Sequence, residues 1–230
     1  MIQLKKLSKS YGSNLVLDSI DMQLPRGAIV GLMGPNGCGK TTLMKIITGM
    51  INDYSGIVRV DGQPVGPHTK SVVAYLPDRT YLAPWMSAKQ AINYMDDFYQ
   101  NFDKAKAMEM LGQFQLAPDM RVKTMSKGMQ EKLLLLLTMS RAAKLYVLDE
   151  PLGGVDPSAR QFIMDTILNN RPEGSTILLS THMIYDMERV FDYALMVGRQ
   201  KILVYDSVQN LEAKGKTLNE LFQEVFPYVG

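Results

Sequence analysis

The run of residues from 34 to 41 carries the clearest chemical signal in the sequence. It fits the phosphate-binding pattern G-x-x-x-x-G-K-[ST], and its members in order are Gly34, Pro35, Asn36, Gly37, Cys38, Gly39, Lys40 and Thr41. Glycines adopt backbone angles that other residues cannot, so the main chain can approach a ligand and direct several N–H groups at phosphate oxygens. Lys40 is expected to reach the terminal phosphates, and the Thr41 hydroxyl to ligate Mg²⁺, a cation that prefers oxygen. The run therefore predicts a nucleotide site, with a chance glycine-rich turn as the alternative.

The residues on either side of this run favour the same interpretation. Residues 28–33 are apolar and predict a short buried strand, and residues 42–47 predict a helix that ends near Gly49. A strand that leads through a glycine-rich turn into a helix N-terminus gathers backbone amides around one concavity, where the helix dipole also favours negative charge. Thr42, which follows Thr41, is expected to belong to the same phosphate cradle.

Two adjacent carboxylates follow a second apolar strand. Residues 145–148 are Leu-Tyr-Val-Leu, and Asp149 and Glu150 come directly after them. Parallel strands present their carboxyl ends at one edge of a sheet, which is also the edge that carries the phosphate loop. Asp149 is therefore expected to hold Mg²⁺, directly or through water, and Glu150 to polarise a water against the γ-phosphate. A strand that merely ends in two solvated acids is the alternative.

The composition narrows the class of protein. A net charge of +2, from 25 basic and 23 acidic residues, gives no reason to expect a nucleic acid as partner. Cys38 is the only cysteine, so no disulfide can form within the chain, and a filler role is favoured over redox sensing. The N-terminus lacks the apolar segment of a signal peptide, and the longest apolar run, at 133–137, is far short of the ~20 residues that cross a bilayer. These features predict a cytosolic chain.

The order of the predicted elements indicates an α/β fold. Residues 2–7 and 20–24 predict an antiparallel β layer that precedes the phosphate-loop strand. Strands and helices then alternate, which implies a mostly parallel sheet with crossover helices, as in a P-loop NTPase core. The remaining predicted strands are 57–60, 71–76, 145–148, 176–179 and 194–197.

A helical block interrupts this pattern from residue 87 to about residue 143. We predict a helical subdomain at residues 87–141, inserted into a core formed by residues 1–86 and 142–206, and a helical tail at residues 207–230. Several helix starts carry side chains that can accept hydrogen bonds from free backbone amides. They are Ser87 with Gln90, Asp103, Ser126, and Asp156 before Pro157.

Four short segments together resemble the ABC-type ATPases. The phosphate loop, Ser126-Lys127-Gly128, Asp149-Glu150-Pro151 and Ser180-Thr181-His182 occur in the order and spacing of that family. Each segment is a weak signal alone, but the ordered set is highly specific. The chain looks like the nucleotide-binding subunit of an ABC transporter, and the resemblance extends from Ile2 to about Asp206.

The resemblance implies roles for residues that lie outside the phosphate loop. Tyr11 matches the aromatic residue that stacks on adenine, with an ordinary packed tyrosine as the alternative. Ser126 and Gly128 occupy the family signature, which contacts the γ-phosphate of ATP bound to the other subunit of a dimer. Lys127 and Met129 depart from the usual L-S-G-G-Q pattern. Lys127 could add charge near the nucleotide or simply face water.

Three further positions complete the implied site. Asp156, with Gly153 and Gly154 before it, falls where the family has a loop that contacts the partner subunit. His182 lies where a histidine senses the γ-phosphate and can orient Glu150. Asp78 stands where the family usually has a glutamine that touches Mg²⁺ and the attacking water. We expect Asp78 to serve as a Mg²⁺ or water ligand, and a merely solvated side chain is the alternative.

The resemblance implies an ATP- and Mg²⁺-dependent ATPase subunit. It would work as a homodimer or a heterodimer with another ABC ATPase, on the cytoplasmic side of the membrane, and would energise a separate permease. The signature and His182 segments look most like bacterial efflux or antimicrobial-peptide resistance ATPases, which favours export. A non-transport soluble ABC ATPase and a regulatory subunit with weak hydrolysis are the alternatives.

The permease is expected to dock in a groove between the core and the helical subdomain. The candidate contact residues are Tyr81, Leu82, Trp85 and Met86, because partner helices often enter apolar grooves. Burial of these side chains under the helical block is the alternative.

Overall fold

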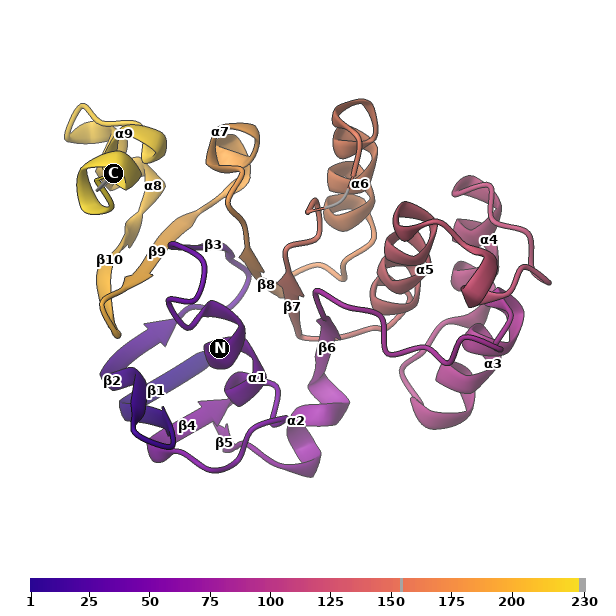
Figure 1. Ribbon diagram of the computed structural model, residues 1–230, viewed down its shortest axis with the longest axis horizontal. Coiled ribbons are helices and arrows are strands. Elements are labelled where there is room, and N and C mark those ends of the chain that lie inside the picture. Colours follow the sequence, from indigo (N-terminus) through magenta and orange to yellow (C-terminus); the bar gives the residue numbers. More distant parts are fainter. Residues whose placement is uncertain (154, 228–230) are drawn as a thin grey trace.

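Two β-sheets and the helices around them make up the fold, as Figure 1 shows. The computed structural model describes residues 1–153 and 155–227, and it describes Pro157 and Asp186 by their backbone alone. The antiparallel sheet lies below the large sheet in this view, and the inserted helices lie at the right. Gly154, which the sequence placed in the loop before Asp156, lies outside the described residues.

The large sheet has the strand order β10-β9-β3-β8-β7-β6. Its strands from β9 to β6 run parallel to one another, and β10 alone is antiparallel to its neighbour β9. The expected mostly parallel sheet is therefore present. The strands are β3 (Ile29–Met33), β6 (Val73–Leu76), β7 (Leu145–Asp149), β8 (Thr176–Ser180), β9 (Tyr193–Gly198) and β10 (Lys201–Ser207).

The small sheet is the predicted antiparallel layer. It has the order β2-β1-β4-β5, with β1 (Ile2–Tyr11), β2 (Asn14–Leu24), β4 (Ser55–Val60) and β5 (Gln63–Pro64). The alternating pattern at 20–24 is confirmed, because Ile20, Met22 and Leu24 are buried while the two residues between them are exposed. A strand that is apolar on one face and wet on the other follows from this alternation.

Helix α1 (Lys40–Ile47) lies in the core between the two sheets. Its apolar residues and those of both sheets form one cluster of buried side chains, so α1 is fixed from two sides. The position of α1 matters for the site because the phosphate loop continues directly into the first turn of this helix. The residues of α1 in this cluster are Leu43, Met44, Ile46 and Ile47.

The opposite face of the large sheet is covered by the inserted helices and by helices that follow them in the sequence. A second apolar cluster joins that face to the inserted helices and to the C-terminal helices. The inserted helices are α3 (Ala88–Phe98), α4 (Lys104–Gln113), the short η1 (Val122–Thr124) and α5 (Lys127–Met139). The helices that follow β7 are α6 (Pro157–Asn169), α7 (Ile184–Met187), η2 (Glu188–Val190), α8 (Val208–Ala213) and α9 (Leu218–Val225).

Three of the predicted helix caps are confirmed. Ser87 and Gln90 satisfy each other's backbone amides at 3.2 and 2.8 Å, and Asp103 accepts a bond from the amide of Lys106. Ser126 accepts one from the amide of Met129. The cap predicted for Asp156 is wrong in its chemistry, because this residue stands at the N-cap position but its side chain makes no cap hydrogen bond.

The strand predicted at 71–76 begins two residues late. Residues 71 and 72 end helix α2 (Pro67–Val72), and β6 starts at Val73. Pro67 stands at the first helical position, where its fixed φ angle and missing N–H are tolerated, so the helix is locally well specified. The apolar Val72 and Val73 belong to one sequence run but to two different elements.

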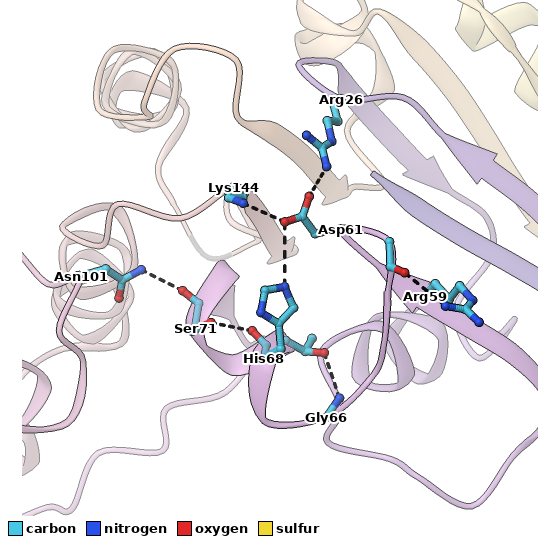
Figure 2. A network of polar contacts seen from close by, with 10 residues as sticks. Arg26, Arg59, Asp61, Gly66, His68, Ser71, Asn101 and Lys144 are labelled. Carbon is cyan, nitrogen blue, oxygen red and sulfur yellow. Dashed lines mark hydrogen bonds and ion pairs between the residues drawn. The ribbon is translucent and has the colours of Figure 1, made fainter.

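Asp61 ties the small sheet to the large one (Figure 2). Its side chain lies in the turn between β4 and β5 and pairs with Arg26, from the turn before β3, and with Lys144, from the residue before β7, at 2.8 Å. His68 of α2 points at the same carboxylate from 3.9 Å. The hydrogen bond to Lys144, and then the charges of Lys144 and Arg26, lower the pKa of Asp61, so the carboxylate is ionised across the neutral range.

Arg141 ties the inserted helices to β6. Its guanidinium donates to the carbonyl oxygen of Val73 at 2.7 Å and to the side chain of Asn101 at 3.2 Å, and it lies 3.8 Å above the ring of Tyr99. Asn101 in turn donates to the carbonyl oxygen of Ser71 at 3.1 Å, as Figure 2 shows. None of the helices in the described part of the chain is long and apolar enough to span a bilayer.

Candidate active site

The phosphate loop is held in its shape by glycines with positive φ angles. Gly34, Gly37 and Gly39 have φ values of 153°, 78° and 106°. A Cβ at Gly34 would lie 2.2 Å from the carbonyl oxygen of Val197 on β9 and 2.7 Å from the sulfur of Cys38. The loop therefore rests directly on β9, and a side chain at Gly34 would lift it away.

Lys40 turns back onto the loop that precedes it. Its ammonium donates to the carbonyl oxygens of Gly34 at 2.7 Å and Pro35 at 3.1 Å, and the side chain is buried. Carbonyl dipoles are weaker partners for a cation than phosphate oxygens, because the latter carry full negative charge. Lys40 is thus oriented in advance toward the mouth of the loop, where a phosphate group can replace the carbonyls.

Ser180 holds Asp149, the last residue of β7, and Glu150, the residue that follows it. Its hydroxyl donates to Oδ1 of Asp149 at 2.7 Å and accepts a bond from the backbone N–H of Glu150 at 2.9 Å. Ser180 ends the neighbouring strand β8 in register with Asp149, so the sheet itself delivers the contact. Asp149 is only 2% exposed, and its second oxygen, Oδ2, is buried with no hydrogen-bond partner in the described residues.

Glu150 and His182 form a pair at the mouth of the site. Nδ1 of His182 lies 2.8 Å from Oε2 of Glu150, within hydrogen-bond distance. Glu150 has a φ of 51°, a conformation that costs free energy for a residue with a side chain. With this backbone conformation the chain turns out of the buried strand β7, and the Glu150 carboxylate lies beside His182.

These side chains meet around one cavity of about 520 Å³. The structure brings ten of the predicted site residues to its wall: Asn36, Gly37, Gly39, Lys40, Thr41, Thr42, Asp78, Asp149, Glu150 and His182. A cavity of this size, lined by backbone amides, a lysine, hydroxyls and acids, suits a nucleoside triphosphate. Contact of each residue with a nucleotide stays a prediction.

The other predicted site residues lie outside the cavity wall. Gly34, Pro35 and Cys38 form the body of the loop, and burial raises the pKa of the Cys38 thiol although Lys40 partly opposes this. Ser126 and Gly128 begin α5, and Asp156 precedes α6. Tyr11 is half exposed at the end of β1, with the ammonium of Lys9 lying 4.5 Å from the centre of its ring.

The oxygen donors beside the phosphate loop fit Mg²⁺. Asp149, whose Oδ2 is buried without a partner in the described residues, and Thr41 line one cavity, and carboxylate and hydroxyl oxygens are hard ligands. No cluster of three or more His, Cys, Asp or Glu side chains that could hold a metal occurs within residues 1–153 and 155–227. Mg²⁺ bound with a nucleotide does not need one, because phosphates and waters supply most of its ligands. Asp78, an exposed carboxylate on the same wall, can add to this set.

A second, more apolar cavity of about 350 Å³ lies where the inserted helices meet the core. We call it the docking groove; its wall includes Met50, Tyr75, Tyr81, Tyr94, Phe98 and Arg141. Of the four predicted docking residues, Tyr81 is 50% exposed and lines the groove, and Trp85 is 65% exposed nearby in sequence. Leu82 and Met86 are buried, so for these two residues the alternative prediction, burial under the helical block, is confirmed.

Sequence reasoning missed Val16 and the role of Ser180. Val16, on β2, lines the cavity together with Gly153, which the sequence placed only in the loop that contacts the partner subunit, and Ser180 anchors both acids. Val16 has no local signal, because it reaches the cavity only once the small sheet has packed beside the phosphate loop. The anchoring role of Ser180 had a signal that was not used, since Ser180 is a polar residue at the end of a strand parallel to the one that bears Asp149.

Known proteins resemble this chain along most of its length. A family model described as ABC transporter matches residues 17–153. The lantibiotic transport ATP-binding protein SrtF of Streptococcus pyogenes is 30% identical over 217 residues, which cover 92% of this chain and 94% of that protein. The Nod factor export ATP-binding protein I of Cupriavidus pinatubonensis is 28% identical over 211 residues, covering 88% and 65%. A solved ATP binding subunit of an ABC transporter has a TM-score of 0.88 at 26% identity and covers 98% of this chain and 99% of that one.

Proposed function

Because this chain belongs to the ABC transporter family of ATPases, we propose that it is the ATP-hydrolysing subunit of an exporter and acts on a separate membrane permease. The observation that supports catalysis best is the pairing of Glu150 with His182 at the mouth of the cavity, 2.8 Å apart, beside the phosphate loop and Asp149. A site that only bound nucleotide would need the loop but not this pair.

Each side chain has a distinct task in the proposed reaction. Lys40 leaves the carbonyls of Gly34 and Pro35 and takes phosphate oxygens in their place. Glu150 accepts a hydrogen bond from a water and directs it at the γ-phosphate, and His182 keeps the carboxylate in position. Thr41, Asp149 and Asp78 would hold Mg²⁺, which neutralises phosphate charge when bound.

We further propose that a second ATPase subunit completes each site. Ser126 and Gly128 lie outside the cavity wall, at the N-terminus of α5, a helix of 13 residues whose first amides and dipole favour an anion. Two subunits related by a two-fold axis would each place this helix start against the other's nucleotide. The partner can be a second copy of this chain or a related subunit.

The docking groove is the proposed contact with the permease. The side chains of Met50, Tyr81, Tyr94 and Phe98 on its wall are exposed in the single subunit, and an amphipathic helix fits such a groove. Transport in the outward direction is proposed from the similarity to proteins named for lantibiotic transport and Nod factor export.

The variant Glu150→Gln tests the catalytic and dimer proposals together. The amide keeps the size of the side chain and can still accept a bond from His182, so ATP binding should be unchanged. Loss of the carboxylate should lower kcat for ATP hydrolysis by about 10²–10³-fold and let an ATP-bound dimer accumulate. Hydrolysis is measured by phosphate release and dimer formation by light scattering after size exclusion.

The matched control is Ser126→Arg in the Glu150→Gln background. It should keep ATP binding and lose the dimer, because the larger cationic side chain blocks the helix start. Equal hydrolysis by the wild type and Glu150→Gln would refute the catalytic assignment and favour a regulatory ATP-binding subunit. Co-purification with ribosomes or DNA, instead of a multi-span membrane protein, would favour the non-transport alternative.

A further inference from the structure

Lys9 is a buried lysine to which the proposed reaction gives no task. It lies in β1, two residues before Tyr11, and only 3% of its surface is exposed. Its ammonium donates to Oδ2 of Asp53 at 2.6 Å, and Asp53 lies in the segment between α1 and β4. That hydrogen bond lowers the pKa of Asp53, so the carboxylate is ionised at neutral pH. Taking an ammonium out of water costs free energy that one exposed partner offsets only in part, so the pairing with Asp53 does not by itself explain a lysine here.

The ammonium of Lys9 lies over one face of the Tyr11 ring. It is 4.5 Å from the centre of the ring, within the range of about 6 Å of a cation–π interaction. Alternate residues of a strand point to the same face of the sheet, which brings the two side chains together. Tyr11 is 49% exposed, so it is not an ordinary packed tyrosine. Because Lys9 occupies one face of the ring, a second ring can stack only on the other face.

The hairpin of β1 and β2 places Tyr11 beside the phosphate loop. Tyr11 is paired with Asn14, which comes two residues before Val16 on the wall of the candidate active site. A Cβ at Gly39 of the loop would lie 3.1 Å from Cγ1 of Val16 and 3.3 Å from its carbonyl oxygen, so the hairpin and the loop are in direct contact. Two residues of a strand span about 7 Å. A nucleotide whose phosphates occupy the loop extends from them by a ribose and a base, so its base can reach this ring.

A positive charge behind the Tyr11 ring favours a base in front of it. The faces of aromatic rings carry partial negative charge, which opposes face-to-face stacking of two rings. The ammonium of Lys9 offsets that charge on the side of Tyr11 that it covers. It also restricts the ring to one orientation before a ligand arrives, and a ring that is already oriented loses less conformational entropy on binding.

We propose that Lys9 is a positioning residue for the nucleotide base: its ammonium holds the Tyr11 ring from behind, so that the exposed face of the ring stacks on the base of ATP. This rests on the proposed function, because it requires a triphosphate in the phosphate loop. Lys9 lies behind the ring and acts only through Tyr11. Its effect on binding is therefore confined to the base and does not extend to the phosphates.

The test compares Lys9→Met with Asp53→Asn in the full chain. Methionine keeps an unbranched apolar side chain and removes the ammonium. Asp53→Asn is the matched control, because its amide oxygen can still accept the bond from Lys9, so the ion pair is lost while the ammonium stays over the ring. Calorimetry in Mg²⁺ measures the affinity for ATP and for tripolyphosphate, which has no ribose and no base.

Lys9→Met should weaken ATP binding about three- to fivefold and leave tripolyphosphate binding unchanged. A merely structural role in the hairpin would weaken both, since Val16 contacts the phosphate loop. Asp53→Asn should bind both ligands as the wild type does. The proposal is overturned if Lys9→Met binds ATP as tightly as the wild type, if it loses affinity for both ligands alike, or if Asp53→Asn shows the same loss.

A second set of variants tests whether Lys9 acts through Tyr11. Tyr11→Leu removes the ring and should weaken ATP binding by about fivefold or more, again without an effect on tripolyphosphate. Adding Lys9→Met to Tyr11→Leu should cause no further loss, whereas independent effects would multiply. Multiplied losses, or an unchanged ATP affinity in Tyr11→Leu, would overturn the proposal. A wild type that binds neither ATP nor tripolyphosphate would instead refute the proposed function.

Discussion

Removing the Ser180 hydroxyl should destabilise the protein far more than removing a neighbouring buried hydroxyl. The variant Ser180→Ala leaves two groups without their partner: Oδ1 of Asp149, which is buried, and the backbone N–H of Glu150, which is partly buried. A hydrogen bond to a charged group contributes about 1.5–3 kcal/mol, and a partly buried amide left unpaired costs about 1 kcal/mol. The free energy of unfolding should therefore fall by about 2.5–4 kcal/mol.

The matched control is Ser175→Ala. Ser175 precedes the first residue of β8 and Ser180 is the last residue of that strand, and both are buried, with exposed fractions of 3% and 0%. The Ser175 hydroxyl, however, has no hydrogen-bond partner in the described part of the chain. Its removal takes nothing from a neighbour, so stability should stay the same or rise slightly.

Urea unfolding and thermal melting of the nucleotide-free proteins measure the difference. For a chain of this length, 1 kcal/mol corresponds to about 2–4 °C in Tm, so Ser180→Ala should melt roughly 5–16 °C lower. ATP hydrolysis should also fall, because both acids lose their common anchor. If Ser180→Ala proves as stable as Ser175→Ala, then the two hydrogen bonds contribute nothing and the proposed anchoring of the acids is wrong.

Two other changes test features away from these acids. Asp61→Asn should lower stability by about 1–2 kcal/mol at pH 7, since Arg26 and Lys144 are largely exposed and can be hydrated when the charge is lost. The folded-state pKa of Asp61 is lowered, so its contribution is present above the unfolded pKa and disappears as the pH falls through the folded value. Urea unfolding at pH 7 and at a series of pH values from 4 down to 2 should show the difference in stability between wild type and variant narrowing in acid, and a difference of constant size across this range would refute the ion-pair explanation. Cys38 should react slowly with a maleimide at pH 7, because burial raises the pKa of its thiol, and saturating ATP should slow the reaction further. Mass spectrometry follows the adduct; labelling as fast as that of free cysteine would contradict the described burial.

The sequence was informative where chemistry is local. The phosphate loop, the strand before it and the helix after it are contiguous, so glycine spacing and apolar runs specify them together. Ser87, Asp103 and Ser126 cap their helices because an N-cap acts on amides only two or three residues away. Asp156 has the right residue type and position, yet local pattern could not tell that its side chain makes no cap bond.

Long-range contacts escaped prediction. Val16 reaches the nucleotide cavity from a different sheet, and Asp61 meets Arg26 and Lys144 from positions 35 and 83 residues away in the sequence. No local sequence pattern predicts contacts between residues so far apart in the sequence. The edge strand β10 was also missed, since none of its residues is fully buried and its pairing with β9 defines it.

The backbone conformation of Glu150 lowers the stability of the folded protein, while the side chain at this position is the one proposed to be needed for ATP hydrolysis. Its φ of 51° lies in the left-handed region, where a residue with a side chain carries a penalty of about 1–2 kcal/mol and glycine carries none. A search for heat-resistant variants would therefore be drawn toward glycine at this position and would discard the acid in the process. Thermal robustness is a poor guide for engineering this turn, and libraries aimed at it should be screened by turnover first.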